Sequence, residues 1–156
     1  MIQDFDSQLQ VSLRALQEVV APALIGADKH VVEQLALATL TLGFVKQRLP
    51  EARRFYRWEL GAYLDLARTL GPSPALDAFI VDATVELARA EADTADFETV
   101  NRRGRDAIAA FVDADASPAI VKRVLEASKT IVDQQRLWCV PFGFELRPED
   151  LPAAAW

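Results

Sequence analysis

Apolar residues recur along this chain at spacings of three and four positions, which is the period of an α-helix buried on one face. The first stripe contains Ile2, Phe5, Leu9, Leu13, Leu16 and Val20. Further stripes follow, and the pattern predicts helices over residues 2–20, 31–49, 51–70, 74–87, 97–112 and 118–138. We therefore expect an all-α fold, an antiparallel helical bundle of about six helices.

The predicted helices are separated by residues that end one helix and begin another. Gly71-Pro72 closes a helix, and Ser73-Pro74 and Ser117-Pro118 each pair a capping serine with a proline that suits a first helical turn. Asp28 is the predicted N-cap of the second helix, and Pro50 ends that helix. The short connections at these breaks favour antiparallel neighbours.

Two of the predicted helices carry features that bear on packing. The second helix is apolar on more than one face, since Leu37, Leu40 and Phe44 lie outside its main stripe, so we expect it to be central. Gly104 interrupts the stripe of the fifth helix, where glycine costs about 1 kcal/mol relative to alanine. A glycine at this position predicts the close approach of another helix.

The helical pattern ends after Cys139. We therefore divide the chain into a helical bundle domain, residues 1–139, and an extended C-terminal tail, residues 140–156. The tail contains prolines and aromatic residues and closes with Ala-Ala-Ala-Trp, which is apolar enough to avoid water. We expect the tail to pack in a groove of its own bundle or of a partner subunit.

Composition and charge narrow the class of protein. Of the 156 residues 51% are apolar, which suits a globular domain, and the net charge of −6 disfavours binding to nucleic acid or anionic lipid. The start of the chain shows no secretory signal pattern, and the longest uncharged stretch, residues 35–45, is too short to span a membrane. Cys139 is the only cysteine, which suits a reducing compartment. We expect a cytoplasmic protein that binds neither nucleic acid nor membrane.

The single histidine, His30, argues against the cofactor chemistry that helical bundles often support. A di-iron bundle needs two Glu-x-x-His units, and a haem needs an axial histidine that is buried rather than in a first helical turn. A phosphotransfer histidine is usually followed by a lysine and a small residue, where this chain has Glu33 and Gln34. We therefore expect no metal and no cofactor.

Glu59 is the strongest candidate for a buried chemical group, because it lies on the apolar side of its helix. A carboxylate there must find a partner or accept a raised pKa. Together with Tyr63, Ser128 and Gln135 it could line an apolar pocket for a small ligand, or the site of an enzyme. The alternative is a structural ion pair, or polar groups that bond to the backbone within the core.

Two further clusters indicate binding surfaces. Arg102, Arg103 and Arg105 could bind an anion or an acidic partner, or could pair with acidic residues of the same chain. Trp58, Phe142, Phe144 and Trp156 exceed what one core can bury, so they indicate an interface or a groove filled by the tail. The leading hypothesis is a non-enzymatic protein that acts through association, as a homodimer or with a protein partner. The alternative is a protein or enzyme that binds a small apolar ligand near Glu59.

Overall fold

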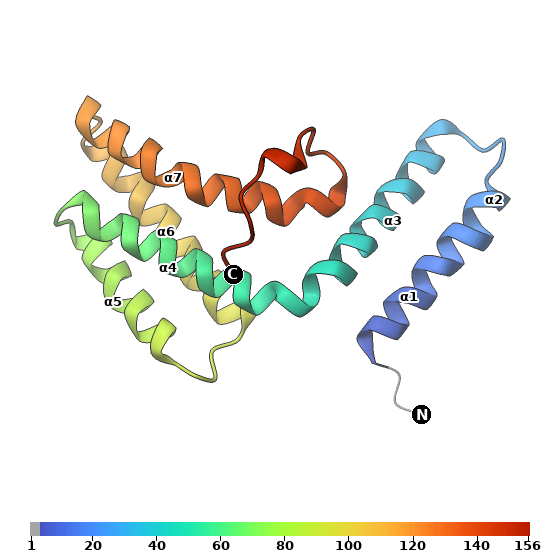
Figure 1. Ribbon diagram of the computed structural model, residues 1–156, viewed down its shortest axis with the longest axis horizontal. Helices are drawn as coiled ribbons and strands as arrows, with labels where there is room; N and C mark the ends of the chain where they lie inside the picture. The colour runs from blue at the N-terminus through green and yellow to red at the C-terminus, as the bar shows by residue number, and fades with distance from the viewer. Residues whose placement is uncertain (1–3) are drawn as a thin grey trace. The chain divides into compact units, whose positions relative to one another are not determined.

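The computed structural model describes residues 4–156, and Ile2 of the first predicted stripe lies outside them. The structure is 82% helical, and residues 4–156 contain no strand. The all-α class that the sequence predicts is therefore confirmed. The α-helices are α1 (Phe5–Ala15), α2 (Ala21–Ala23), α3 (Lys29–Arg48), α4 (Ala52–Leu70), α5 (Pro74–Ala88), α6 (Thr94–Ala114) and α7 (Pro118–Cys139) (Figure 1). All of them are long except α2, which has three residues.

Short segments connect or extend these helices. A π-helical turn, η1 (Leu16–Val20), continues α1 toward α2, and 3₁₀ turns form η2 (Leu49–Glu51), η3 (Val140–Phe142) and η4 (Pro148–Asp150). Asp28 and Ser73 occupy the N-cap positions of α3 and α5, although neither side chain makes a capping hydrogen bond. The helix starts predicted from these two residues are thus confirmed.

The chain divides into two compact units, which we describe separately. Unit 1 consists of the described part of residues 1–50 together with 138–150, and unit 2 consists of residues 51–137 together with 151–156. The segment 140–156 that the sequence predicts as one tail is therefore shared, with its first part in unit 1 and its last six residues in unit 2.

Unit 2 contains nearly all of the buried core. Helices α4, α5 and α6 pack against one another, and Ile131 of α7 joins the same cluster. Leu60, Leu76 and Phe97 are among the most completely buried residues of this core. A Cβ atom added to Gly104 of α6 would lie 2.6 Å from the ring of Phe79 on α5. The close helix approach predicted at Gly104 is therefore confirmed.

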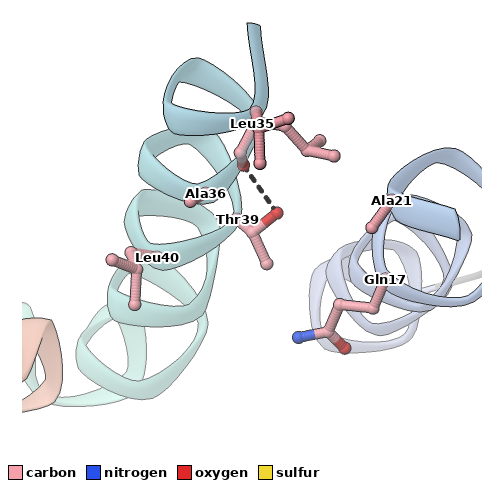
Figure 2. A pocket seen from close by; sticks show the side chains of 7 residues that line it. Gln17, Ala21, Leu35, Ala36, Thr39 and Leu40 are labelled. Carbon is pink, nitrogen blue, oxygen red and sulfur yellow. Dashed lines mark hydrogen bonds between the residues drawn. The ribbon is translucent and has the colours of Figure 1, made fainter. Parts of the chain in front are cut away.

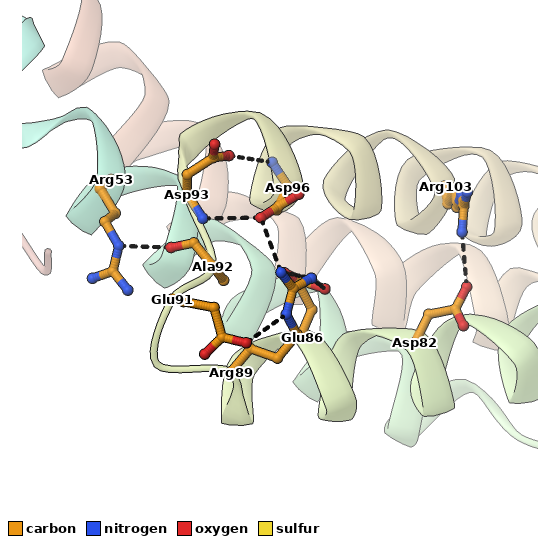
Figure 3. A network of polar contacts seen from close by, with 9 residues as sticks. All are labelled: Arg53, Asp82, Glu86, Arg89, Glu91, Ala92, Asp93, Asp96 and Arg103. Atoms are coloured by element: carbon orange, nitrogen blue, oxygen red, sulfur yellow. Dashed lines mark hydrogen bonds and ion pairs between the residues drawn. The ribbon is translucent and has the colours of Figure 1, made fainter.

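Polar contacts fix the connection between α5 and α6 (Figure 3). The Arg53 guanidinium donates hydrogen bonds to the carbonyl oxygens of Ala92 (2.8 Å) and Ala90 (3.0 Å). Asp93 and Asp96 form a reciprocal capping box at the start of α6, with each carboxylate accepting from the backbone N–H of the other residue. These contacts satisfy backbone groups that a helix end would otherwise leave unpaired.

Unit 1 is built around the pair α1 and α3, and it has little interior. The two helices pack together and are joined by an ion pair of 3.0 Å between Lys46 and Asp6. Leu13 is the one buried residue of α1, and α3 contains none. The sequence-based expectation that this apolar second helix is central was therefore wrong within unit 1. Apolar periodicity reports that a helix needs cover, and does not say whether its own chain supplies it.

Candidate functional site

A cluster of polar side chains crosses the interior of unit 2. Glu59 of α4 is only 3% exposed, and its carboxylate accepts hydrogen bonds from two helices. Asn101 Nδ2 on α6 donates to Glu59 Oε2 at 3.0 Å, and Gln135 Nε2 on α7 donates to Glu59 Oε1 at 2.7 Å. The carboxylate therefore joins three helices through two hydrogen bonds, each with an acceptor that carries charge.

Tyr63 and Arg105 complete this cluster. Gln135 Nε2 also lies 3.2 Å from the Tyr63 hydroxyl oxygen, one turn further along α4 from Glu59. Arg105 forms a longer ion pair with Glu59 Oε2, at 3.8 Å, and its guanidinium lies 5.9 Å from the centre of the Tyr63 ring. The structure thus brings Glu59, Tyr63 and Gln135 together through hydrogen bonds.

Burial changes the acidity of the two titratable groups that α4 contributes to this cluster, Glu59 and Tyr63. Desolvation raises the pKa of Glu59, and the Gln135 hydrogen bond and the Arg105 charge offset this only in part. Desolvation also raises the pKa of Tyr63, and the neighbouring Glu59 carboxylate raises it further. A carboxyl group with a raised pKa can hold or release a proton nearer to neutrality than an exposed one.

Asn101 is fully buried, and its side chain is only partly satisfied. Nδ2 donates to the Tyr56 carbonyl oxygen as well as to Glu59, each at 3.0 Å, so the amide orientation is fixed by two acceptors. Asn101 Oδ1 is buried and accepts no hydrogen bond from the protein. Sequence reasoning missed Asn101, although it lies four residues after Phe97 and three before Gly104 on the buried stripe of α6.

The remaining predicted pocket residue lies apart from these contacts. Ser128 is half-buried on α7, seven residues before Gln135, and it takes part in none of the cluster's hydrogen bonds given above. Glu59 lines none of the three cavities described below. The ligand pocket near Glu59 stays a prediction.

The three arginines predicted to bind an anion are each close to a carboxylate of unit 2. Arg102 pairs with Glu98 at 3.4 Å, and Arg103 pairs with Asp82 at 3.1 Å (Figure 3). Arg105 faces Glu59. Neighbouring negative charge lowers the attraction of these arginines for an external anion, so anion binding stays a prediction.

The surplus aromatic residues have different environments. Trp156 contacts Phe55 in unit 2, where Trp58 also lies 6.3 Å from Phe55 between ring centres. In unit 1, the Phe142 ring stacks on Phe44 of α3 with ring centres 4.1 Å apart. Phe144 stays 73% exposed. The structure therefore places two of the four predicted residues against helices of their own chain.

The exposed apolar residues are concentrated on α1, α3 and the turns beside them. We use the term hairpin surface for Phe5, Val11, Val19, Val20, Ile25, Val31, Val32, Leu37, Leu40, Val45 and Leu49. These are eleven of the seventeen large apolar side chains that are exposed in the described chain. A concentration of exposed apolar side chains on one part of a folded protein indicates an interaction site.

An open cavity of about 420 Å³ lies beside the hairpin surface (Figure 2). Gln17 and Ala21 border it on one side, and Leu35, Ala36 and Leu40 of α3 on the other. The Thr39 hydroxyl, which also faces the cavity, donates its hydrogen bond to the Leu35 carbonyl oxygen at 2.8 Å. Most of the residues that line this cavity are therefore apolar, and the Thr39 hydroxyl already donates its hydrogen bond to the backbone of its own helix.

The described residues offer little for metal or thiol chemistry. Within residues 4–156, no group of three or more histidine, cysteine, aspartate or glutamate side chains is arranged to hold a metal ion. Cys139 is exposed, and partial desolvation raises the pKa of its thiol, which is opposite to what a nucleophile requires.

Comparisons with known proteins give no further guide to the site. No family model, curated protein or solved structure matches this chain. Among the helices of residues 4–156, none is both long and apolar enough to cross a membrane.

Proposed function

We propose that this protein acts through association, and that it forms a homodimer through the hairpin surface. The observation that best supports this proposal concerns α3, which has 20 residues and apolar side chains on more than one face. None of its residues is buried. Burying a leucine or valine side chain contributes about 1.5–3 kcal/mol. Helices α1 and α3 and the turns beside them expose eleven large apolar side chains, and transferring these from water to an interface with a partner would be favourable.

The packing within unit 1 supports a partner that inserts side chains. Besides the cavity near Leu40, cavities of about 380 and 330 Å³ follow the same pair of helices, bordered by Leu13 and Gly43 in one case and by Phe5 and Val45 in the other. Protein interiors are close-packed and contain few voids larger than a water molecule. Side chains from a second surface would give this helix pair the packing of an ordinary interior.

A second copy of this chain is the partner that charge and area favour. Residues 1–50 carry five acidic and four basic side chains, so two such surfaces repel each other weakly although the whole chain carries −6. A helix of this length spans about 30 Å, and two adjacent helices are about 20 Å wide. Each copy would then contribute about 600 Å², which brings the total to the lower end of stable interfaces, about 1,200 Å².

A matched pair of leucine substitutions tests this proposal. Leu40 on α3 is 41% exposed, and Leu125 on α7 is 66% exposed. We expect Leu40→Glu to shift the protein from dimer to monomer in sedimentation velocity, because it places a charge in the apolar contact. Leu125→Glu introduces the same charge outside the hairpin surface and should leave the dimer intact. A dimer that survives Leu40→Glu at the wild-type concentration would contradict the use of this surface.

The second candidate function is the binding of a small molecule at the Glu59 cluster. It is favoured by the buried Asn101 Oδ1, an acceptor that the protein leaves without a donor beside a buried carboxylate. Native mass spectrometry of wild type and Glu59→Gln would test it, since a bound molecule held by Glu59 should add mass to the wild type alone. Equal masses, after allowance for the substitution, would count against this candidate.

A further inference from the structure

The last six residues of unit 2 are held through their main chain by one buried side chain. Gln134 of α7 is only 2% exposed. Its Nε2 donates to the Ala153 carbonyl oxygen, and its Oε1 accepts from the Ala155 N–H, both at 2.9 Å. One amide thus pairs with a carbonyl and an N–H two residues apart, which is how a neighbouring β-strand would bind an extended segment.

The side chain after this pair is recognised separately. Trp156 follows Ala155, and its indole Nε1 donates to Glu51 Oε2 at 3.1 Å. Its ring meets Phe55 edge to face, with ring centres 5.1 Å apart and an interplanar angle of 89°. Phe55 is itself buried at the start of α4. The indole therefore receives a fixed apolar contact and an acceptor for its one donor.

None of the contacts described above involves residues 140–150, which join the segment to the rest of the chain. We propose that Glu51, Phe55 and Gln134 form a peptide-docking site for an extended segment. Gln134 binds the carbonyl oxygen of one residue of the segment and the N–H of the residue two positions later. Glu51 and Phe55 bind a tryptophan side chain at the position after that. The segment that the structure shows in this site is residues 151–156, so the partner that fits it is the same segment of a second copy.

Small residues before the tryptophan suit this mode of binding. Ala153 and Ala155 lose no side-chain entropy when they are ordered, and they let the backbone approach the Gln134 amide. Within one chain, the segment competes with an external one at an effective concentration in the millimolar range. Exchange is therefore visible when the internal segment is weakened or when the external peptide is concentrated.

The test uses a labelled peptide, Leu-Pro-Ala-Ala-Ala-Trp with both ends blocked, and the full-length chain carrying Trp156→Ala. We expect saturable binding in fluorescence anisotropy, with half-saturation at about one tenth of the peptide concentration that the wild type requires. Adding Gln134→Ala to this variant should weaken binding at least about tenfold, because both main-chain hydrogen bonds are lost. Lys129→Ala, an exposed change on the same helix, should have no effect.

Several results would overturn the proposal. One is the absence of saturable binding to a folded Trp156→Ala chain at about 1 mM peptide. A second is that the peptide binds as tightly to the chain carrying both Trp156→Ala and Gln134→Ala as to the chain carrying Trp156→Ala alone. A third is that a peptide with alanine in place of its tryptophan binds as tightly as the original peptide. If Trp156→Ala prevents folding, the wild type can be titrated instead and the Ala155 amide followed by NMR. An Ala155 resonance that is unchanged at about 1 mM peptide would also refute exchange. Since the readout is peptide binding, failure here leaves the homodimer proposal standing.

Discussion

Replacing Gly104 by alanine tests whether α5 and α6 approach as closely as the structure shows. The new Cβ atom would lie 2.6 Å from both Cε2 and Cζ of Phe79, a distance that forces one of the groups to move. Phe79 is 2% exposed and belongs to the core, so its ring has little room. Gly61 on α4 is the matched control, because a Cβ atom there meets nothing within 4 Å.

The expected magnitudes follow from two opposing effects. Alanine is favoured over glycine within a helix by about 0.8–1 kcal/mol, and this gain applies to both positions. Overpacking a core costs about 1–3 kcal/mol, and this cost applies to Gly104 alone. Gly61→Ala should therefore stabilise the protein, and Gly104→Ala should be neutral or destabilising by up to about 2 kcal/mol.

Thermal unfolding followed by calorimetry would measure both variants against the wild type. A difference of about 2 kcal/mol between them corresponds to a separation of about 4–8 °C in midpoint for a chain of this size. If Gly104→Ala raised the midpoint as much as Gly61→Ala, the close contact with Phe79 would be refuted.

Two further predictions concern charged groups. Burial raises the pKa of Glu59 above its ordinary 4.5, so the native state binds this proton more tightly than the unfolded state, and the free energy of unfolding falls as pH rises from 4.5 through the raised pKa. In Glu59→Gln this decrease in the free energy of unfolding with pH should be absent. Urea titrations would measure it, and the same pH dependence in variant and wild type would contradict the prediction. Asp93→Ala should lower the free energy of unfolding by about 0.5–2 kcal/mol through loss of the capping box, whereas Asp28→Ala, whose carboxylate makes no capping bond, should have little effect in the same titration.

The sequence predicted the helices well because its start and stop signals act locally. The serine and proline at 73–74 and the glycine and proline at 71–72 act within one turn of chain, and α4 ends and α5 begins at these residues in the structure. The close approach of α5 to Gly104 was also predictable, because glycine destabilises a helix relative to alanine and is favoured on a buried stripe mainly where a neighbouring helix leaves no room for a side chain. The division into two units was not predicted, because which helices share a core depends on contacts between distant residues.

The candidate site shows the same division between local and distant information. Glu59 was identifiable from its place on an apolar stripe, but its partners come from residues 42 and 76 positions away along the chain. The role of Gln134 was not predictable from that of Gln135, because consecutive residues of a helix point in different directions, and here the two side chains bind different partners. For α3, the apolar periodicity indicated a need for burial, and the structure shows that unit 1 buries none of its residues completely.

The measurement that most directly tests the proposed association is native mass spectrometry of the wild-type chain, supported by sedimentation velocity over a range of micromolar concentrations. We predict a dimer of the 17.2 kDa chain with no additional mass. A monomer throughout that range would contradict the proposal that the hairpin surface binds a second copy. A dimer carrying extra bound mass would support the second candidate function, the binding of a small molecule at the Glu59 cluster.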